Sequence, residues 1–199
     1  MMTEKQAEKL QLKIKKIKAE LAADKRRWGG FYDDSRGLRY LPPELYVKLQ
    51  DWDGGLRYLK WFEKNFPDDI GFPNFLFEWT VILFNKGKLK EAEQKAFQTY
   101  FGNTYLFDTV FEQIPLKIIK YENSNLENLE YTKDFKYRHH QKGMEAFANW
   151  LGAFIRSGKF IEISKKFVDF QVLLYNEKDK EVRSHILAQE RKLIKEVMM

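Results

Sequence analysis

The fold is decided by Trp79-Thr-Val-Ile-Leu-Phe-Asn-Lys-Gly-Lys-Leu-Lys-Glu-Ala-Glu-Gln-Lys-Ala-Phe97. An apolar helix ends there at a Lys-Gly-Lys turn, and an amphipathic helix follows with the small residue Ala92 near its start. Glycine directly after an apolar run is a common signal for the end of a helix. The stretch therefore predicts two helices joined by a tight turn.

The same layout occurs in two other parts of the chain. Residues 46–62 carry it with Gly55 at the small position, and residues 150–167 carry it with Ile163 there. Gly55 and Ala92 are 37 residues apart, whereas Ala92 and Ile163 are 71 residues apart. Since 71 is close to two such periods, a degenerate copy fits in the interval. The spacing predicts four units.

A two-helix unit with a period of roughly 34–37 residues resembles the tetratricopeptide repeat. Residues 87–92 are similar to the family's inter-helix turn and small residue, and Pro67 stands where its helix-ending proline falls. Thr104 and Tyr175 replace that proline in later units. The resemblance implies an all-α fold of antiparallel helix-turn-helix repeats, stacked as a short right-handed α-solenoid with extra N-terminal and C-terminal helices.

A narrower resemblance covers the start of the first repeat. Residues 34–45 are similar to the pattern Asp-Asn-x-Gly-x-Arg-Tyr-Leu-Leu, which opens a repeat pair in some tetratricopeptide-like proteins. The matching positions are Asp34, Gly37, Arg39 and Tyr40, and Arg36 departs from the usual Gln. The family implies helical scaffolding and offers no catalytic residue to carry over.

The expected organisation has four parts. They are a basic amphipathic helix over 1–27, a Gly/aromatic loop over 28–37, repeats over 38–176 and a capping helix over 177–199. The repeat boundaries fall at about 38–70, 71–103, 104–140 and 141–176. The helices expected in the first three repeats are 39–50 and 54–65, 74–86 and 89–100, and 104–121 and 125–138, and the final helix is 181–198. Ile114-Pro115 is expected to kink or break its helix, because proline lacks the amide donor.

The N-terminal segment 3–27 is rich in helix formers and contains nine Lys and Arg against four Asp and Glu, so most of the net charge of +6 lies there. Its apolar residues recur at spacings of three and four, which predicts one stripe of Ala7, Leu10, Ile14, Ile17 and Leu21. This helix either docks on the rest of the domain or pairs with a second copy, forming a homodimer through residues 3–27. Thr3 is its expected N-cap.

Composition excludes several classes of protein. The chain has 199 residues, 44% of them hydrophobic, which is enough for a core. It has no cysteine, so disulfides, thiolate zinc sites and iron–sulfur clusters are excluded. The N-terminal residues are charged and lack an apolar signal region, and no apolar run approaches the roughly 18 residues of a membrane span. We therefore expect a cytoplasmic protein without a membrane contact.

No group of residues forms a recognisable catalytic set. His139 and His140 are adjacent, and on a helix their side chains would point about 100° apart, so a shared metal is not expected. Asp33 and Asp34 are expected to cap a helix or turn, with a divalent cation as the alternative. The glycine pairs lack the spacing of phosphate-binding loops. We expect no enzyme activity, no cofactor and no metal.

The sequence favours a non-enzymatic protein–protein interaction scaffold that binds a peptide or protein partner in the groove of the repeats. The alternative is a nucleic-acid-binding protein that uses the basic N-terminal helix. Polar residues near the expected groove are the candidates for partner binding, with the first three placed beside the glycine-rich loop. They are Arg36, Arg39, Tyr40, Lys48, Asn74, Glu78, Asn85 and Arg156.

Overall fold

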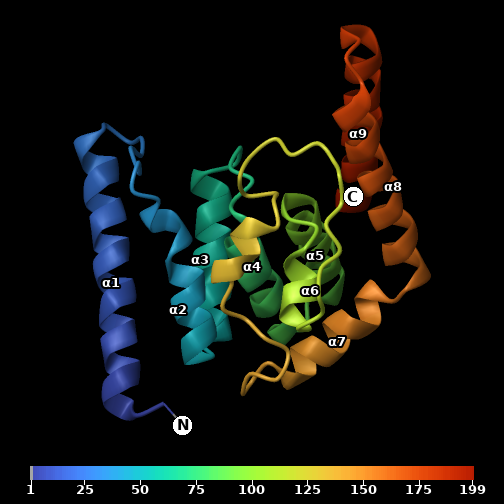
Figure 1. The fold of residues 1–199 in the computed structure, drawn as a ribbon. Helices are drawn as coiled ribbons and strands as arrows, with labels where there is room; N and C mark the ends of the chain where they lie inside the picture. The colour runs from blue at the N-terminus through green and yellow to red at the C-terminus, as the bar shows by residue number, and fades with distance from the viewer. Residues whose placement is uncertain (1) are drawn as a thin grey trace. The chain divides into compact units, whose positions relative to one another are not determined.

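The computed structural model describes residues 2–199 (Figure 1). Over these residues the regular structure consists of α-helices and short 3-10 turns, with no β-strand, so the expected all-α class is confirmed. The chain divides into two compact units, Met1–Leu89 and Lys90–Met199. Within the described range, no helix combines the length and the hydrophobicity needed to cross a membrane.

Unit 1 contains four α-helices and one 3-10 turn. They are α1 (Glu4–Arg27), η1 (Leu38–Tyr40), α2 (Pro42–Leu49), α3 (Trp52–Asn65) and α4 (Pro73–Asn85). Helix α1 lies alongside η1 and α2, and α3 packs against both α2 and α4 (Figure 1). These bounds agree with the helices expected from the sequence to within about three residues at each end, the first of them being divided into η1 and α2.

Helix α1 has the cap and the apolar stripe expected of it. The Thr3 side chain accepts a hydrogen bond from the Gln6 amide, and the Gln6 side chain accepts one from the Thr3 amide. Ile14, Ile17 and Leu21 are buried. The apolar stripe is therefore docked within unit 1.

Two adjacent glycines allow the helices of unit 1 to approach closely. A Cβ atom on Gly54 would lie 2.6 Å from Cε1 of Tyr46 in α2, and one on Gly55 would lie 2.9 Å from Cδ1 of Ile82 in α4. Both distances are too short for a real Cβ contact. The missing side chain of Gly54 thus allows α3 to approach α2 closely, and that of Gly55 allows α3 to approach α4. The Asp51 carboxylate caps α3 by accepting a hydrogen bond from the Gly54 amide at 2.8 Å.

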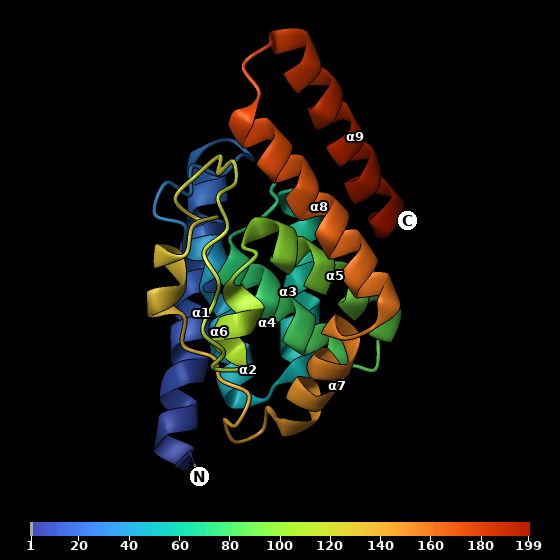
Figure 2. The same ribbon diagram turned by 45° about the vertical axis from the view of Figure 1, so that its right-hand side comes forward.

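Unit 2 contains the remaining helices. They are α5 (Leu89–Gly102), α6 (Leu106–Val110), η2 (Glu130–Asp134), α7 (Glu145–Ile155), α8 (Gly158–Asn176) and α9 (Lys180–Met198). Helix α8 packs against α7 and forms a long hairpin with α9 (Figure 2). Phe97 of α5 is fully buried, and its ring centroid lies 5.2 Å from that of Phe154 and 5.3 Å from that of Phe160.

The prediction of helices over 104–121 and 125–138 is wrong. Only the five residues of α6 and the five of η2 are helical there. Glu112 adopts a left-handed conformation with φ 55° directly after α6, and Pro115 cannot supply an amide to continue a helix. The chain then runs without helical bonds past Ile118, whose amide and carbonyl both bond to the Tyr105 hydroxyl at 3.2 Å.

Candidate functional site

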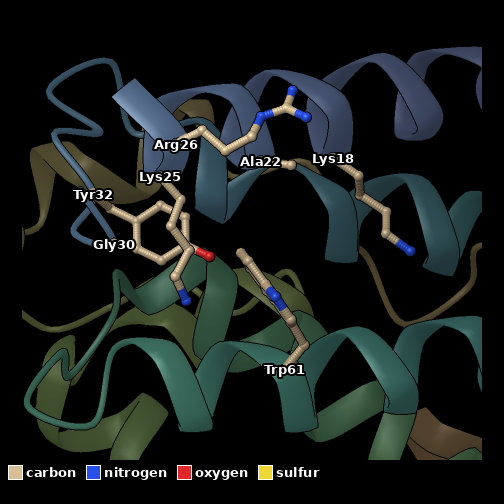
Figure 3. Close-up of a pocket in the computed structure, with 7 residues that line it drawn as sticks. All are labelled: Lys18, Ala22, Lys25, Arg26, Gly30, Tyr32 and Trp61. Carbon is tan, nitrogen blue, oxygen red and sulfur yellow. The ribbon is translucent and has the colours of Figure 1, made fainter. Parts of the chain in front are cut away.

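A cleft of about 620 Å³ opens in unit 1 between α1, the following loop and α3 (Figure 3). We name it the α1 cleft. Seven residues line it: Lys18, Ala22, Lys25, Arg26, Gly30, Tyr32 and Trp61. Its volume lies within the range of roughly 300–1,000 Å³ that is usual for ligand pockets.

One wall of the α1 cleft is a single face of α1. Lys18, Ala22 and Arg26 follow one another at intervals of four residues, so their side chains share one side of the helix. The short side chain of Ala22 lies between Lys18 and Arg26 along the helix, as Figure 3 shows. Among residues 2–199, neither Lys18 nor Arg26 has a side-chain partner in a hydrogen bond or ion pair, and both are exposed. The wall therefore presents two cations that are available to an anionic ligand.

The opposite wall is aromatic. The ring of Tyr32 lies edge-on to that of Trp61, with centroids 5.9 Å apart. The Tyr32 hydroxyl and the Lys25 ammonium both donate to Oδ1 of Asn65, at 3.2 and 2.8 Å. Burial raises the pKa of Tyr32, and the charge of Asp24 raises it further, so the phenol is neutral at pH 7. The Trp61 indole N–H has no acceptor within the described part of the chain, which leaves a donor at the cleft.

The loop over 28–37 shapes this end of the cleft. Gly30 has a φ of 104°, a backbone conformation that residues with a side chain rarely adopt. The Asp24 carboxylate accepts a hydrogen bond of 2.8 Å from the Asp33 amide, which ties the loop to α1. Two aromatic side chains of the loop point to solvent, since Phe31 is 78% exposed and Trp28 is 50% exposed. Apolar surface of this kind beside a cleft is typical of interaction sites.

Arg39 and Tyr40 belong to a separate network, which we name the Arg39 clasp (Asp34, Arg39, Tyr40 and Asp69). The Arg39 guanidinium donates to Asp69 at 2.7 Å and to Asp34 at 3.3 Å. The Tyr40 hydroxyl donates to Oδ2 of Asp69 at 2.6 Å. Burial and this bond to Asp69 raise the pKa of Tyr40 to about 12. Asp34 also accepts from the amides of Leu38 and Arg39, so it caps η1, one of the roles expected for this pair of acids.

Two further candidates lie in exposed ion pairs. Arg36 bonds to Glu20 of α1 at 2.9 Å, and most of its side chain is exposed. Lys48 pairs with Glu44 one turn earlier on α2. Neither residue lines the α1 cleft.

The last four candidates differ in burial and in their side-chain contacts. Glu78 is only 5% exposed, and Asn85 donates to the Val81 carbonyl within its own helix at 2.8 Å. Oδ1 of Asn74 is buried and has no partner within residues 2–199. Arg156 is exposed and belongs to unit 2. The predicted set is therefore spread over several environments.

The residues of the α1 cleft were not among the sequence-based candidates. Trp61 lies in the helix expected over 54–65 and Tyr32 in the Gly/aromatic loop over 28–37, and neither is among those candidates. The sequence signal for the cleft is the four-residue spacing of Lys18, Ala22 and Arg26. This spacing places two cations on one face of the helix, with a small residue between them. Nothing in the sequence brings Trp61 to that face.

No protein-family model matches the chain, and no curated protein or solved structure is significantly similar to it. What the α1 cleft can do therefore follows from its own side chains. Two available cations, one free indole donor and an aromatic wall together suit a ligand that carries both negative charge and apolar surface.

Proposed function

We propose that this chain is a non-enzymatic, cytoplasmic interaction module whose α1 cleft binds an acidic segment of a partner protein. The observation that carries the proposal is the pairing of unpartnered Lys18 and Arg26 with the rings of Tyr32 and Trp61 across one cleft. Cations at the edge select carboxylates, and the aromatic wall receives an apolar side chain.

A peptide suits this cleft better than a small anion. The cleft holds more space than one carboxylate needs, and its lining includes two aromatic side chains, Tyr32 and Trp61. The Trp61 indole N–H can donate to a main-chain carbonyl of a bound segment. Phe31, which follows Gly30 of the lining, is exposed and offers further apolar surface. Aromatic side chains and arginine are the residue types that dominate binding energy in protein interfaces.

The stacking of helices as tetratricopeptide-like repeats is part of the same proposal. In unit 1, α3 packs against its own partner α2 and against α4, the first helix of the next expected repeat, and α2 also contacts α4. In unit 2, α7 and α8 form the corresponding pair. These neighbour relations support a repeat arrangement within each unit.

The proposal is tested by charge reversal in the α1 cleft. Short acidic peptides, each with one Trp, Phe or Leu, are screened against the full chain by fluorescence anisotropy. Lys18→Glu and Arg26→Glu should each weaken binding about tenfold, because a like charge then faces the ligand. Lys9→Glu is the matched control, since Lys9 is exposed on the same helix outside the cleft. Its affinity should equal that of the wild type.

The same variants separate the nucleic-acid alternative. Labelled RNA and DNA oligonucleotides would bind the whole basic face of α1, so Lys9→Glu would then weaken binding as much as Lys18→Glu, with steep salt dependence.

Self-association through residues 3–27 would appear as a doubled solution mass. The peptide proposal would be overturned if Lys18→Glu, Arg26→Glu and Lys9→Glu all lowered the affinity for the peptides equally, or if the wild type bound no peptide.

A further inference from the structure

Unit 2 brings together two histidines and one carboxylate from distant parts of the chain. The Nδ1 atom of His140 lies 2.9 Å from Oε2 of Glu112, and the Nδ1 atom of His139 lies 3.5 Å from the same oxygen. One ligand atom from each residue lies within 4.8 Å of the others, and this is the one such cluster within residues 2–199. We propose that Glu112, His139 and His140 bind a divalent late first-row transition-metal ion, with zinc as the first choice.

The backbone around this cluster is held in place. Glu112 follows α6 with a left-handed φ of 55°, which turns its side chain away from the helix direction. The His139 amide donates to the Val110 carbonyl at 2.8 Å. The His139 ring stacks on that of Phe111, with centroids 5.9 Å apart. The end of α6 and the turn at His139 are thus joined by a backbone bond and a ring contact. Nδ1 of His139 also lies 3.3 Å from the Val110 carbonyl oxygen, a contact that the ring gives up when it binds the ion through Nδ1.

The two histidines are not helical, which removes the argument against a shared metal. They lie in a turn after η2, where the Gln141 amide donates to the Arg138 carbonyl at 3.1 Å. Their rings are 5.2 Å apart and nearly perpendicular. Adjacent side chains in a turn can converge on one point, whereas on a helix they diverge. The expectation that they share no metal assumed a helical backbone at these two residues.

The ligand chemistry and the spacing fit a small borderline metal ion. Zinc bonds of about 2.0–2.1 Å place tetrahedral ligand atoms roughly 3.3 Å apart, close to the two measured separations. Imidazole nitrogen with carboxylate oxygen suits zinc, copper and nickel, whereas calcium and magnesium prefer oxygen alone. Glu112 and His140 are exposed, so the remaining coordination position is open to water or to a side chain of another molecule.

Metal binding would act as a clip on the irregular part of unit 2. It would link residues 112 and 139–140, which bracket the segment without α-helix that contains η2. Because the ion would bind the folded arrangement and not the unfolded chain, it should raise the unfolding temperature in a concentration-dependent way.

The experiment is a titration of the purified full chain, without a polyhistidine tag, with zinc chloride. Calorimetry should show one ion per chain. Glu112→Gln and His140→Ala should each weaken binding by about tenfold or more, and circular dichroism should show unchanged helix content, since both residues are exposed. His185→Ala is the control, because His185 is exposed on α9 and belongs to no such cluster.

A second measurement keeps the result independent of the variants. In a nitrogen-15 spectrum of the imidazole rings, zinc should shift the signals of two of the three histidines and leave His185 in place. The absence of saturable one-to-one binding by the wild type would overturn the proposal. So would equal affinities in all variants, or loss of binding in His185→Ala alone.

Discussion

The Nε atom of Arg39 lies 2.7 Å from Oδ2 of Asp69, thirty residues further along the chain. The same oxygen accepts from the Tyr40 hydroxyl, and Oδ1 accepts from the Gly71 amide at 2.9 Å. The Arg39 and Asp69 side chains are 21% and 16% exposed. Asp69 thus fastens the loop before α4 to the turn η1, in a place where water competes little for the charges.

Asp69→Ala should lower the free energy of unfolding of unit 1 by about 2–3 kcal/mol. Tyr40 then loses its acceptor, and Arg39 loses one of its two carboxylate partners, in a largely buried position. Urea unfolding followed by tryptophan fluorescence measures this, since four of the five tryptophans lie in unit 1. Asp68→Ala is the matched control. Asp68 is exposed, and its loss should change stability by less than about 0.5 kcal/mol. Similar effects from both substitutions would contradict the role of the clasp.

Gly54→Ala should destabilise unit 1 by about 1–3 kcal/mol, although alanine favours helices, because the new methyl group would overlap Tyr46 and the Asp51 cap. Gly158→Ala is the comparison. A Cβ atom there meets nothing within 4 Å, so this substitution should be neutral or stabilising. Thermal unfolding of both variants tests the difference, and a neutral result for Gly54→Ala would refute the close approach of α2 and α3.

Glu190→Gln should stabilise the chain at pH 7 by about 1 kcal/mol, because Oε2 of Glu190 is buried without a hydrogen-bond partner. Burial, and next the charge of Glu127, raise the pKa of Glu190 above its ordinary 4.5. The folded state therefore holds more protons between 4.5 and the raised pKa, and stability increases as the pH falls through that pKa.

Glutamine cannot titrate, so the advantage of Glu190→Gln should shrink as the pH is lowered towards 4.5. Urea unfolding of the two proteins at a series of pH values measures the difference directly. If the difference in free energy of unfolding between the two proteins stayed constant over the pH series, the charge of Glu190 would not destabilise the folded state.

Asp179→Ala should cost about 1 kcal/mol by uncapping α9, because the Asp179 carboxylate accepts from the amides of Glu181 and Val182. Ser184→Ala, exposed in the interior of the same helix, should be neutral or slightly stabilising. Helix content by circular dichroism during heating checks both. Equal melting of the two variants would argue against the cap.

The sequence predicted those elements whose signals are local. The Thr3 cap, the stripe of Ile14, Ile17 and Leu21 and the glycine-marked turn at Gly87 each follow from residues within one or two turns of one another. The prediction of helices over 104–140 was wrong, because the repeat there was inferred from the spacing of the flanking repeats and not from the residues of the interval itself. There, Pro115 and the left-handed Glu112 decide the local structure.

The sites were less accessible to sequence reasoning than the helices. Trp61 reaches Tyr32, and Asp69 reaches Arg39, across about thirty residues, and no periodicity encodes such contacts. Arg39 and Tyr40 were predicted to bind a partner, and the side-chain contacts that the structure shows for them lie within the Arg39 clasp. The convergence of Glu112 with His140 depends on a turn at Glu112, inside the helix expected over 104–121, and on a turn at 139–140, just past the helix expected over 125–138.

The Arg39 clasp also bears on the order in which unit 1 acquires its structure. Contacts between neighbouring helices such as α2 and α3 close short loops, whereas the bond from Arg39 to Asp69 requires both helices to be in place first. We therefore expect the clasp to form after the folding transition state. Asp69→Ala should then accelerate unfolding several-fold and leave the folding rate nearly unchanged, so that the clasp governs how long the native state persists.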